Sequence, residues 1–237
     1  MEKLSKNRIK WIRSLHRKKV RKEEGFFLVE GEKIVKELSE RHPEVIDCIC
    51  TTDSNLNLHA NIFSVDGKEM KQISTLQNPS KLVAVVKQKK WIEPTSKSVL
   101  VIDELQDPGN LGTIIRTADW FGFDRIICSM NTVDCYNSKV IQSAMGSLFS
   151  VQIEYHELAN YLDACELPIY AAMLDGEPIS KESLGGPCAL LVGNEGQGIR
   201  SELLPFIDHR IKIEGKGKAE SLNVAIATGI LLSQMSH

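Results

Sequence analysis

The stretch Ala189-Leu190-Leu191-Val192-Gly193-Asn194-Glu195-Gly196-Gln197-Gly198 decides the fold, because it joins a short apolar run to a glycine-rich loop. An apolar run of this length is typical of a strand buried in a parallel sheet. A second such pair follows, in which Arg210-Ile211-Lys212-Ile213 leads into the loop 214–220. Residues 221–232 come next, and we predict a helix capped by Ser221. Two strands that end in glycine loops, the second opening a helix, predict a ligand crevice at the carboxyl ends of the strands.

The two glycine loops suit a small polar ligand, although their spacing does not identify it. Glycine lets backbone N–H groups approach a ligand without a Cβ in the way. A helix N-terminus adds unpaired donors and a partial positive charge. Ordinary turns followed by a core helix would produce the same pattern, so the residues alone leave both interpretations open.

Strands and helices alternate from residue 99 onward, which predicts an α/β sheet. The continuous apolar run Val99–Ile102 is typical of a parallel strand covered on both faces. Asn110 is well suited to cap the helix that follows, and Arg116 lies off the inward apolar stripe of that helix. Further strands are predicted over 125–128, 151–154 and 169–172, and further helices over 138–145 and 156–164.

The first part of the chain predicts a small α/β domain of its own. Its expected strands cover 25–29, 45–50, 62–65 and 82–86, and its expected helices cover 5–22, 31–40 and 66–76. Residues 88–98 are polar and charged and contain a proline, which predicts an interdomain linker. We therefore divide the chain into residues 1–95 and 96–237.

The charge of the chain is unevenly distributed. Residues 1–24 hold ten Lys and Arg against three Glu, a net charge of +7, whereas the whole chain carries −2. A basic arm on an acidic body predicts a polyanionic partner. A solvated helix face is the alternative explanation of the same arm.

Composition excludes several classes of protein. Apolar content of 42% and charged content of 25% in 237 residues are ordinary for a globular protein. No apolar run approaches the roughly 20 residues that span a bilayer. The basic N-terminal segment lacks the apolar core of a secretory signal, although a mitochondrial presequence would also be basic and amphipathic. Six cysteines without C-x-x-C spacing predict reduced thiols in a cytoplasmic protein, and neither these nor the six scattered histidines predict a metal site.

Three motifs in order resemble those of the SpoU family, the S-adenosyl-L-methionine-dependent RNA 2'-O-ribose methyltransferases of the SPOUT superfamily. The first motif is Asn110, five residues and Arg116, the second is residues 192–198, and the third is residues 220–225. Three motifs in the family order are far more specific than any one of them. The resemblance implies a methyl donor, S-adenosyl-L-methionine, and an RNA substrate.

The same resemblance implies the architecture. The C-terminal part would be a SPOUT α/β domain, a parallel sheet with a trefoil knot, which neither composition nor periodicity predicts. Residues 25–87, which contain Phe27-Leu28-Val29-Glu30-Gly31, resemble the L30e-like substrate-binding domain of the family. A homodimer is implied, with one subunit supplying RNA contacts near the site of the other. The L30e-like domain and basic arm favour ribosomal RNA, 23S rRNA in particular, over transfer RNA.

The resemblance also assigns roles to individual residues. Arg116 matches the proposed catalytic residue, which is a poor base by default because arginine stays protonated. It therefore either has an unusual pKa or orients the hydroxyl and a phosphate through its guanidinium. Asn110 would hold Arg116 or the helix turn, and Glu195 would pair with Arg116 or accept a hydrogen bond from substrate. Ser221 and Asn223 would line the site, with helix capping as the alternative role.

Backbone groups of Gly193, Ile213 and Leu222 match the positions that contact the donor in the family. The chain departs from the family at Glu214, where proline is common and fixes the backbone φ of the loop. Two other functions remain as alternatives. One is a non-catalytic RNA-binding protein of the same fold. The other, an enzyme for nucleotide phosphates, lacks support because Gly215-Lys216-Gly217 has no third glycine and no P-loop motif occurs.

Overall fold

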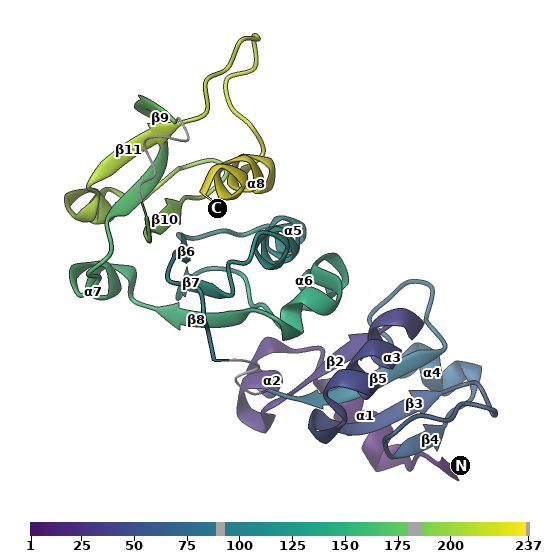
Figure 1. The fold of residues 1–237 in the computed structure, drawn as a ribbon. Helices are drawn as coiled ribbons and strands as arrows, with labels where there is room; N and C mark the ends of the chain where they lie inside the picture. Colours follow the sequence, from purple (N-terminus) through teal and green to yellow (C-terminus); the bar gives the residue numbers. More distant parts are fainter. Residues whose placement is uncertain (89–92, 180–185, 236–237) are drawn as a thin grey trace. The chain divides into compact units, whose positions relative to one another are not determined.

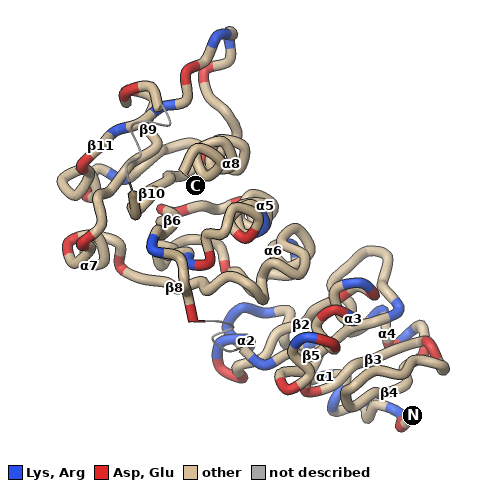
Figure 2. The backbone as a smooth tube through the Cα atoms, viewed as in Figure 1, with Lys and Arg blue, Asp and Glu red and all other residues tan. Residues whose placement is uncertain are grey.

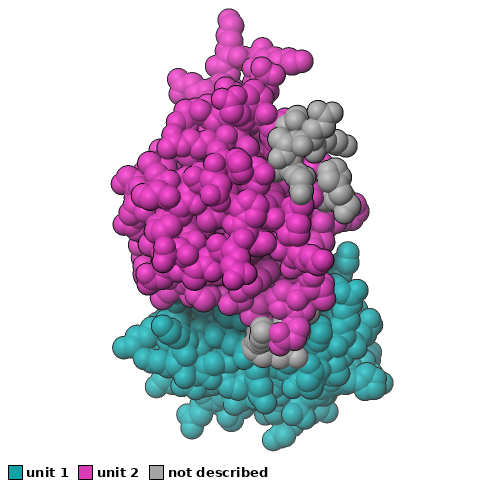
Figure 3. Space-filling model, turned by 60° about the vertical axis from the view of Figure 1, so that its left-hand side comes forward, with its two compact units in different colours: residues 1–90, 136–146 teal, residues 91–135, 147–237 magenta. Residues whose placement is uncertain are grey.

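The computed structural model of the chain describes residues 1–88, 93–179 and 186–235, and the chain divides into two compact units (Figures 1 and 3). The first unit comprises residues 1–90 and 136–146, and the second comprises residues 91–135 and 147–237. Residues 89–92 of the predicted linker lie outside the described residues. The division near residue 95 remains a prediction.

The first unit contains a five-stranded mixed sheet with the order β1-β4-β3-β5-β2. Its strands are β1 (Glu2–Lys3), β2 (Phe26–Glu30), β3 (Ile46–Thr51), β4 (Ile62–Ser64) and β5 (Leu82–Lys87). Its helices are α1 (Lys6–Ser14), α2 (Lys18–Glu24), α3 (Glu32–Arg41), α4 (Gly67–Ile73) and α6 (Ser138–Ala144), with a 3-10 turn at Pro43–Val45. β5 lies between β2 and β3 and is antiparallel to both, so its apolar residues are buried on both faces.

The single helix predicted over residues 5–22 is wrong, because the structure interrupts it between α1 and α2. Arg21 is 6% exposed and donates from Nη1 to the carbonyl oxygens of Leu15 and His16, at 3.0 and 2.8 Å. The His16 ring nitrogen Nε2 lies 2.9 Å from the carbonyl oxygen of Ile73. Arg21 thus satisfies two carbonyl groups that a continuous helix would have bonded within itself, while His16 contacts a carbonyl at the end of α4.

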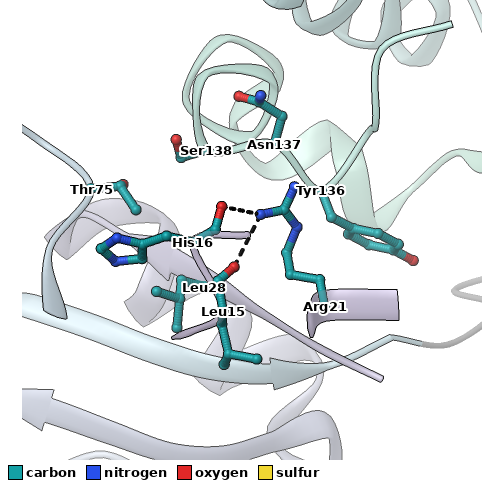
Figure 4. Close-up of a pocket in the computed structure, with 8 residues that line it drawn as sticks. All are labelled: Leu15, His16, Arg21, Leu28, Thr75, Tyr136, Asn137 and Ser138. Carbon is teal, nitrogen blue, oxygen red and sulfur yellow. Dashed lines mark hydrogen bonds between the residues drawn. The ribbon is translucent and has the colours of Figure 1, made fainter. Parts of the chain in front are cut away.

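Leu15, His16 and Arg21 also line a small cavity of about 50 Å³, and Figure 4 shows how their side chains lie. The segment 136–138 completes its wall, and the Tyr136 ring packs against Phe27 in a tilted arrangement with 4.4 Å between ring centroids. Gln142 of α6 donates to the backbone carbonyl of Glu30 at 2.7 Å. Every lining residue belongs to the first unit, so none of the predicted site residues lines this cavity.

The second unit contains a six-stranded parallel sheet with the order β11-β9-β10-β6-β7-β8. Its strands are β6 (Val99–Ile102), β7 (Arg125–Ser129), β8 (Gln152–His156), β9 (Ile169–Pro178), β10 (Ala189–Val192) and β11 (His209–Lys212). Its helices are α5 (Pro108–Trp120), α7 (Leu158–Asp163) and α8 (Val224–Met235), with a 3-10 turn at Ser201–Phe206. A further 3-10 turn, Met145–Phe149, begins in the residues of the first unit and ends in those of the second. The predicted α/β class with a parallel sheet is confirmed.

Helices α5 and α8 pack against each other beside the sheet (Figure 1), whereas α7 packs against the 3-10 turn Ser201–Phe206. β9 is longer than the four residues predicted, because its second half pairs with β11 after a register shift between Arg210 and Ile211. β9 and β11 approach each other closely at this point, since a Cβ on Gly176 would lie 2.6 Å from the backbone nitrogen of Ile211.

The order of the strands places the candidate site. The chain passes from β6 to β7 and β8 on one side, and β10, β9 and β11 lie on the other. From β6 the chain continues to one side of the sheet, and from β10 it continues to the other side. These two neighbouring strands end side by side, at Ile102 and Val192. In open parallel sheets ligands bind at the carboxyl ends of such strands.

Candidate active site

The first motif follows β6, and its helix is capped differently from the prediction. Asp107, not Asn110, is the N-cap of α5, because its carboxylate accepts a hydrogen bond from the Asn110 backbone nitrogen at 2.8 Å. Pro108 follows at the first helical position, where a missing N–H is tolerated. The side-chain amide of Asn110 is consequently available to other parts of the chain.

That amide joins the three motifs. Asn110 donates from Nδ2 to Oε1 of Glu195 at 2.9 Å, and its Oδ1 accepts from Nδ2 of Asn223 at 3.1 Å. The two partners are 85 and 113 residues away in sequence. The structure therefore brings together Asn110, Glu195 and Asn223, three of the five predicted catalytic residues.

The third motif corrects the predicted helix cap. α8 begins at Val224, and Oδ1 of Asn223 accepts from the backbone nitrogens of Ala225 and Ile226, at 2.9 and 3.3 Å. Asn223 is thus the N-cap, and the prediction that Ser221 caps the helix is wrong. Ser221 is exposed and makes no hydrogen bond within the described part of the chain. Asparagine and serine are both good N-caps, so the sequence could not decide between Ser221 and Asn223. Tertiary contacts determine which of the two caps α8.

Arg116 lies on α5 but outside this network. It is six residues from Asn110, which is about 240° around a helix of 3.6 residues per turn. It is exposed and forms no ion pair or hydrogen bond with any described residue, so the pair predicted between Glu195 and Arg116 is not formed. Its guanidinium remains accessible from solvent.

The second motif forms a closed loop after β10, organised by Asn194, a residue that sequence reasoning missed. Asn194 and Gly198 exchange two backbone hydrogen bonds of 2.9 and 3.0 Å. Oδ1 of Asn194 accepts from the amides of Gly196 and Gln197. Gly193 is required by the close approach of the chain, because a Cβ there would lie 2.3 Å from the carbonyl carbon of Gly198.

An ion pair between the buried Asp103 and the partly buried Arg200, next to this loop, was also missed. Asp103 follows β6, is 0% exposed and accepts from Nε of Arg200 at 2.8 Å. Partial burial lowers the pKa of Arg200, but the hydrogen bond and charge of Asp103 outweigh it and leave that pKa above its ordinary value. An aspartate directly after a buried strand was the signal in the sequence, whereas its partner 97 residues away had none.

The three predicted donor-contacting positions lie in loops. Gly193 follows β10, Ile213 follows β11, and Leu222 is 48% exposed just before α8. The connecting loop 214–222 extends away from the sheet (Figure 1) and carries charges of both signs (Figure 2). Among the described residues, no backbone amide of this loop donates a hydrogen bond. Uncommitted backbone groups of this kind fit a nucleoside-like donor, which needs amides and carbonyls along its polar edge.

The described residues include no cluster of three His, Cys, Asp or Glu side chains able to hold a metal ion. All six cysteines are free thiols, and five of them are buried. No helix in the described ranges is long and apolar enough to cross a membrane.

Comparison with known proteins relates both units to RNA methyltransferases. The SpoU rRNA Methylase family matches residues 97–233, and the MRM3-like substrate binding domain matches residues 6–84. The chain is 33% identical to the 23S rRNA (guanosine(2553)-2'-O)-methyltransferase RlmP of Bacillus subtilis, over 98% of this chain and 97% of that protein.

Solved structures give the same result. An RNA methyltransferase of the TrmH family from Porphyromonas gingivalis has a TM-score of 0.84 at 35% identity, covering 98% of each chain. An rRNA methyltransferase from Sinorhizobium meliloti, solved with bound AdoMet, has a TM-score of 0.82 at 30% identity, covering 99% of this chain and 96% of the other.

Proposed function

This chain belongs to the SpoU rRNA methylase family, and we propose from that membership and from the site geometry how it acts and on which RNA. It is an S-adenosyl-L-methionine-dependent enzyme that transfers a methyl group to a ribose 2'-hydroxyl of RNA. One observation supports the assignment of the site: Asn110 hydrogen-bonds both Glu195 and Asn223, so one residue from each motif meets at the carboxyl edge of the sheet.

The proposed substrate is 23S rRNA. The Bacillus subtilis relative, which matches this chain almost from end to end, is named for methylation of a guanosine in that RNA. The first unit supports an RNA partner, because Lys and Arg are concentrated along α1 and α2 (Figure 2). Its match to a substrate-binding domain over residues 6–84 supports the same role. A tRNA substrate is the alternative, and the cytoplasm is the proposed location.

The proposed mechanism divides the work between two groups of residues. The donor, when bound, supplies a methyl group on a positively charged sulfur that becomes neutral as the methyl leaves. Gly193, Ile213 and Leu222 bind the donor through backbone groups. Asn110, Glu195, Ser221 and Asn223 define the wall that faces the acceptor sugar. The reaction then requires alignment of two reactants more than stabilisation of a new anion.

Arg116 is proposed to present the ribose. Its exposed guanidinium is free of protein partners within the described residues and suits bidentate contact with an RNA phosphate. Because a guanidinium is a poor proton acceptor, the proposed role of Arg116 is to orient the 2'-hydroxyl, whose proton would pass to solvent. Of the two roles that the sequence left open, we therefore propose orientation.

A homodimer and the trefoil knot are part of the proposal. Support for the dimer comes from α8, which has no charged residue and leaves Ile226 57% exposed. A helix that is apolar on all sides is normally buried. Support for the knot is the fold similarity to the solved SpoU relatives. In the proposed dimer one subunit contributes RNA contacts beside the site of the other.

The test is methyl transfer by the purified chain. Tritiated donor is incubated with a 23S rRNA transcript, a tRNA pool and an unrelated RNA, and the modified position is mapped by resistance of its 3'-linkage to alkali. Incorporation into 23S rRNA that Arg116→Ala lowers by about a hundredfold or more supports the proposal. Incorporation into tRNA alone would replace the substrate. RNA binding without incorporation would identify a non-catalytic binding protein.

A further inference from the structure

We propose that Asp103 and Arg200 are positioning residues for methyl transfer, because the ion pair of the buried Asp103 with the partly buried Arg200 holds loop 193–198 in the conformation that presents Gly193 and Glu195. Neither residue belongs to the three motifs. The inference rests on the proposed function, since it concerns the same site.

The ion pair connects the segment that follows β6 with the segment that follows β10. Oδ1 of Asp103 accepts from Nε of Arg200 and lies 2.8 Å from Nη2, while Oδ2 accepts from the Arg200 backbone nitrogen at 3.0 Å. The backbone nitrogen of Asp103 donates to the carbonyl of Val192 at 2.9 Å. Asp103 therefore connects the end of β10 to Arg200, which lies just after loop 193–198.

A second link fixes the start of the loop. The carbonyl of Glu104 accepts from Nδ2 of Asn194 at 2.8 Å. Glu104 has a φ of 51°, a conformation uncommon for any residue other than glycine. It is held there by Ser129, whose Oγ accepts from its backbone nitrogen at 2.8 Å, and by Asn131, which donates to its carboxylate at 2.7 Å. Such conformations persist where surrounding contacts fix them, and they occur often at functional sites.

The two links act at the two ends of one short loop. Asn194 is fixed at its start and Arg200 just after its end, and Glu195 lies between them with its carboxylate on Asn110. An ion pair with a buried member adds little net stability compared with apolar packing. Here three contacts to the Asp103 carboxylate restrict both the backbone and the guanidinium of Arg200. The position of this ion pair next to the predicted donor-binding loop is the reason we assign it a positioning role.

The experiment replaces Arg200 by lysine in the full-length protein. Lysine keeps the charge but cannot present the two guanidinium nitrogens to one carboxylate oxygen. We expect donor affinity, measured by calorimetry, and kcat each to fall by about tenfold to a hundredfold, because small displacements of aligned groups have effects of that size. Arg210→Lys is the matched control: Arg210 pairs with Asp175 at 2.8 Å on the exposed edge of the same sheet. We expect it to leave both quantities unchanged.

Two readouts separate positioning from simple stabilisation. In an E195Q background, Arg200→Lys should lower kcat by less than about threefold, because residues that act through one another are not additive. Amide hydrogen exchange at Asn194 and Gly198, which exchange backbone hydrogen bonds, should accelerate in Arg200→Lys without donor or RNA present. Full additivity, or a folded variant with normal donor affinity and kcat, would overturn the inference.

A second variant covers the case in which Arg200→Lys does not fold. Asp103→Asn keeps a side chain of the same shape and an oxygen that can accept from the Arg200 backbone nitrogen, but removes the carboxylate charge that pairs with the guanidinium. We expect the same loss of donor affinity and the same faster exchange in the loop. Normal exchange and affinity in a folded D103N protein would overturn the inference. If the wild-type chain bound no donor at all, the proposed function would fail, whereas the exchange result would still report on the loop.

Discussion

Asn223 has two roles that can be separated by substitution. Its Oδ1 caps α8, while its Nδ2 donates to Asn110. Asn223→Asp retains the capping oxygen but places a carboxylate against the Asn110 oxygen. We therefore expect nearly unchanged thermal stability and at least a tenfold loss of methyl transfer, measured by denaturation and by tritium incorporation.

The comparison variant is Asn223→Ala, which removes both roles. Loss of an N-cap costs about 1 kcal/mol, so this variant should be less stable than N223D and about equally inactive. If N223D retained full activity, the hydrogen bond between Asn110 and Asn223 would have no part in the reaction.

Gly193 is predicted to tolerate no side chain. A Cβ there would lie 2.3 Å from the Gly198 carbonyl carbon and 2.5 Å from the Gly198 oxygen, both of them backbone atoms. Gly193→Ala should lower the free energy of unfolding by about 1–3 kcal/mol and weaken donor binding, because the loop must move. Urea denaturation and calorimetry measure the two effects.

Gly196 supplies the control for that prediction. A Cβ at Gly196 would come no closer than 3.7 Å to Asn194 Oδ1, which is an ordinary contact. Gly196→Ala should leave stability and donor affinity nearly unchanged. Equal effects of the two substitutions would show that glycine flexibility, rather than close packing at Gly193, determines the behaviour of the loop.

Individual site residues were partly predictable from the sequence. The motifs identified Asn110, Glu195 and Asn223, and the structure joins them. The capping roles were wrong at both helices, since Asp107 competes with Asn110 and Asn223 with Ser221 within three residues. Capping preferences among these residue types differ by less than tertiary contacts can supply.

Among the elements, strands were more predictable than helix interruptions. The apolar runs Val99–Ile102 and Ala189–Val192 match β6 and β10 at both ends, because a strand buried on both faces is a continuous apolar segment. The break between α1 and α2 was missed because it depends on Arg21 bonding backbone carbonyls and on His16 meeting Ile73. Neither contact is visible in local periodicity.

The basic arm is predicted to contact RNA through α1 and α2, with two of its arginines excluded. Arg8 pairs with Asp47, and Arg21 is buried. Lys10 and Arg13 are exposed, and replacing both by glutamine should weaken RNA binding. Each lost phosphate contact should reduce the slope of log affinity against log salt by about 0.7–0.9.

Filter binding over a range of salt concentrations measures that slope. The control replaces Lys36 and Arg41 of α3, which pair with Glu32 and Glu37 in the same unit. These substitutions remove the same charge but should leave the slope near the wild-type value. An equal change in both double variants would mean that RNA responds to net charge and not to the surface of α1 and α2.

For the whole molecule, patterning predicted two α/β parts and a charge asymmetry, but it predicted neither the packing of residues 136–146 with the first unit nor the knot that we propose. Segment 136–146 joins the first unit through the tilted contact of the Tyr136 ring with Phe27 and the hydrogen bond from Gln142 to the Glu30 carbonyl. Such contacts depend on the path of the chain in space. In the sequence, only the resemblance of the three motifs to the SpoU family gave an expectation about that path.

The proposed homodimer gives the last prediction. α8 carries no charged residue, and the large apolar side chain of Ile226 is 57% exposed in the single chain. Ile226→Asp would bury a charge if α8 lies in the interface, so sedimentation equilibrium should give twice the 26.5 kDa chain mass for the wild type and a single chain for the variant. The control is Leu174→Asp, at a residue of β9 that is 76% exposed, and this variant should remain dimeric.

Because the proposed site needs RNA contacts from the partner, I226D should also lose methyl transfer. A fully active monomeric I226D would show that one chain holds a complete site.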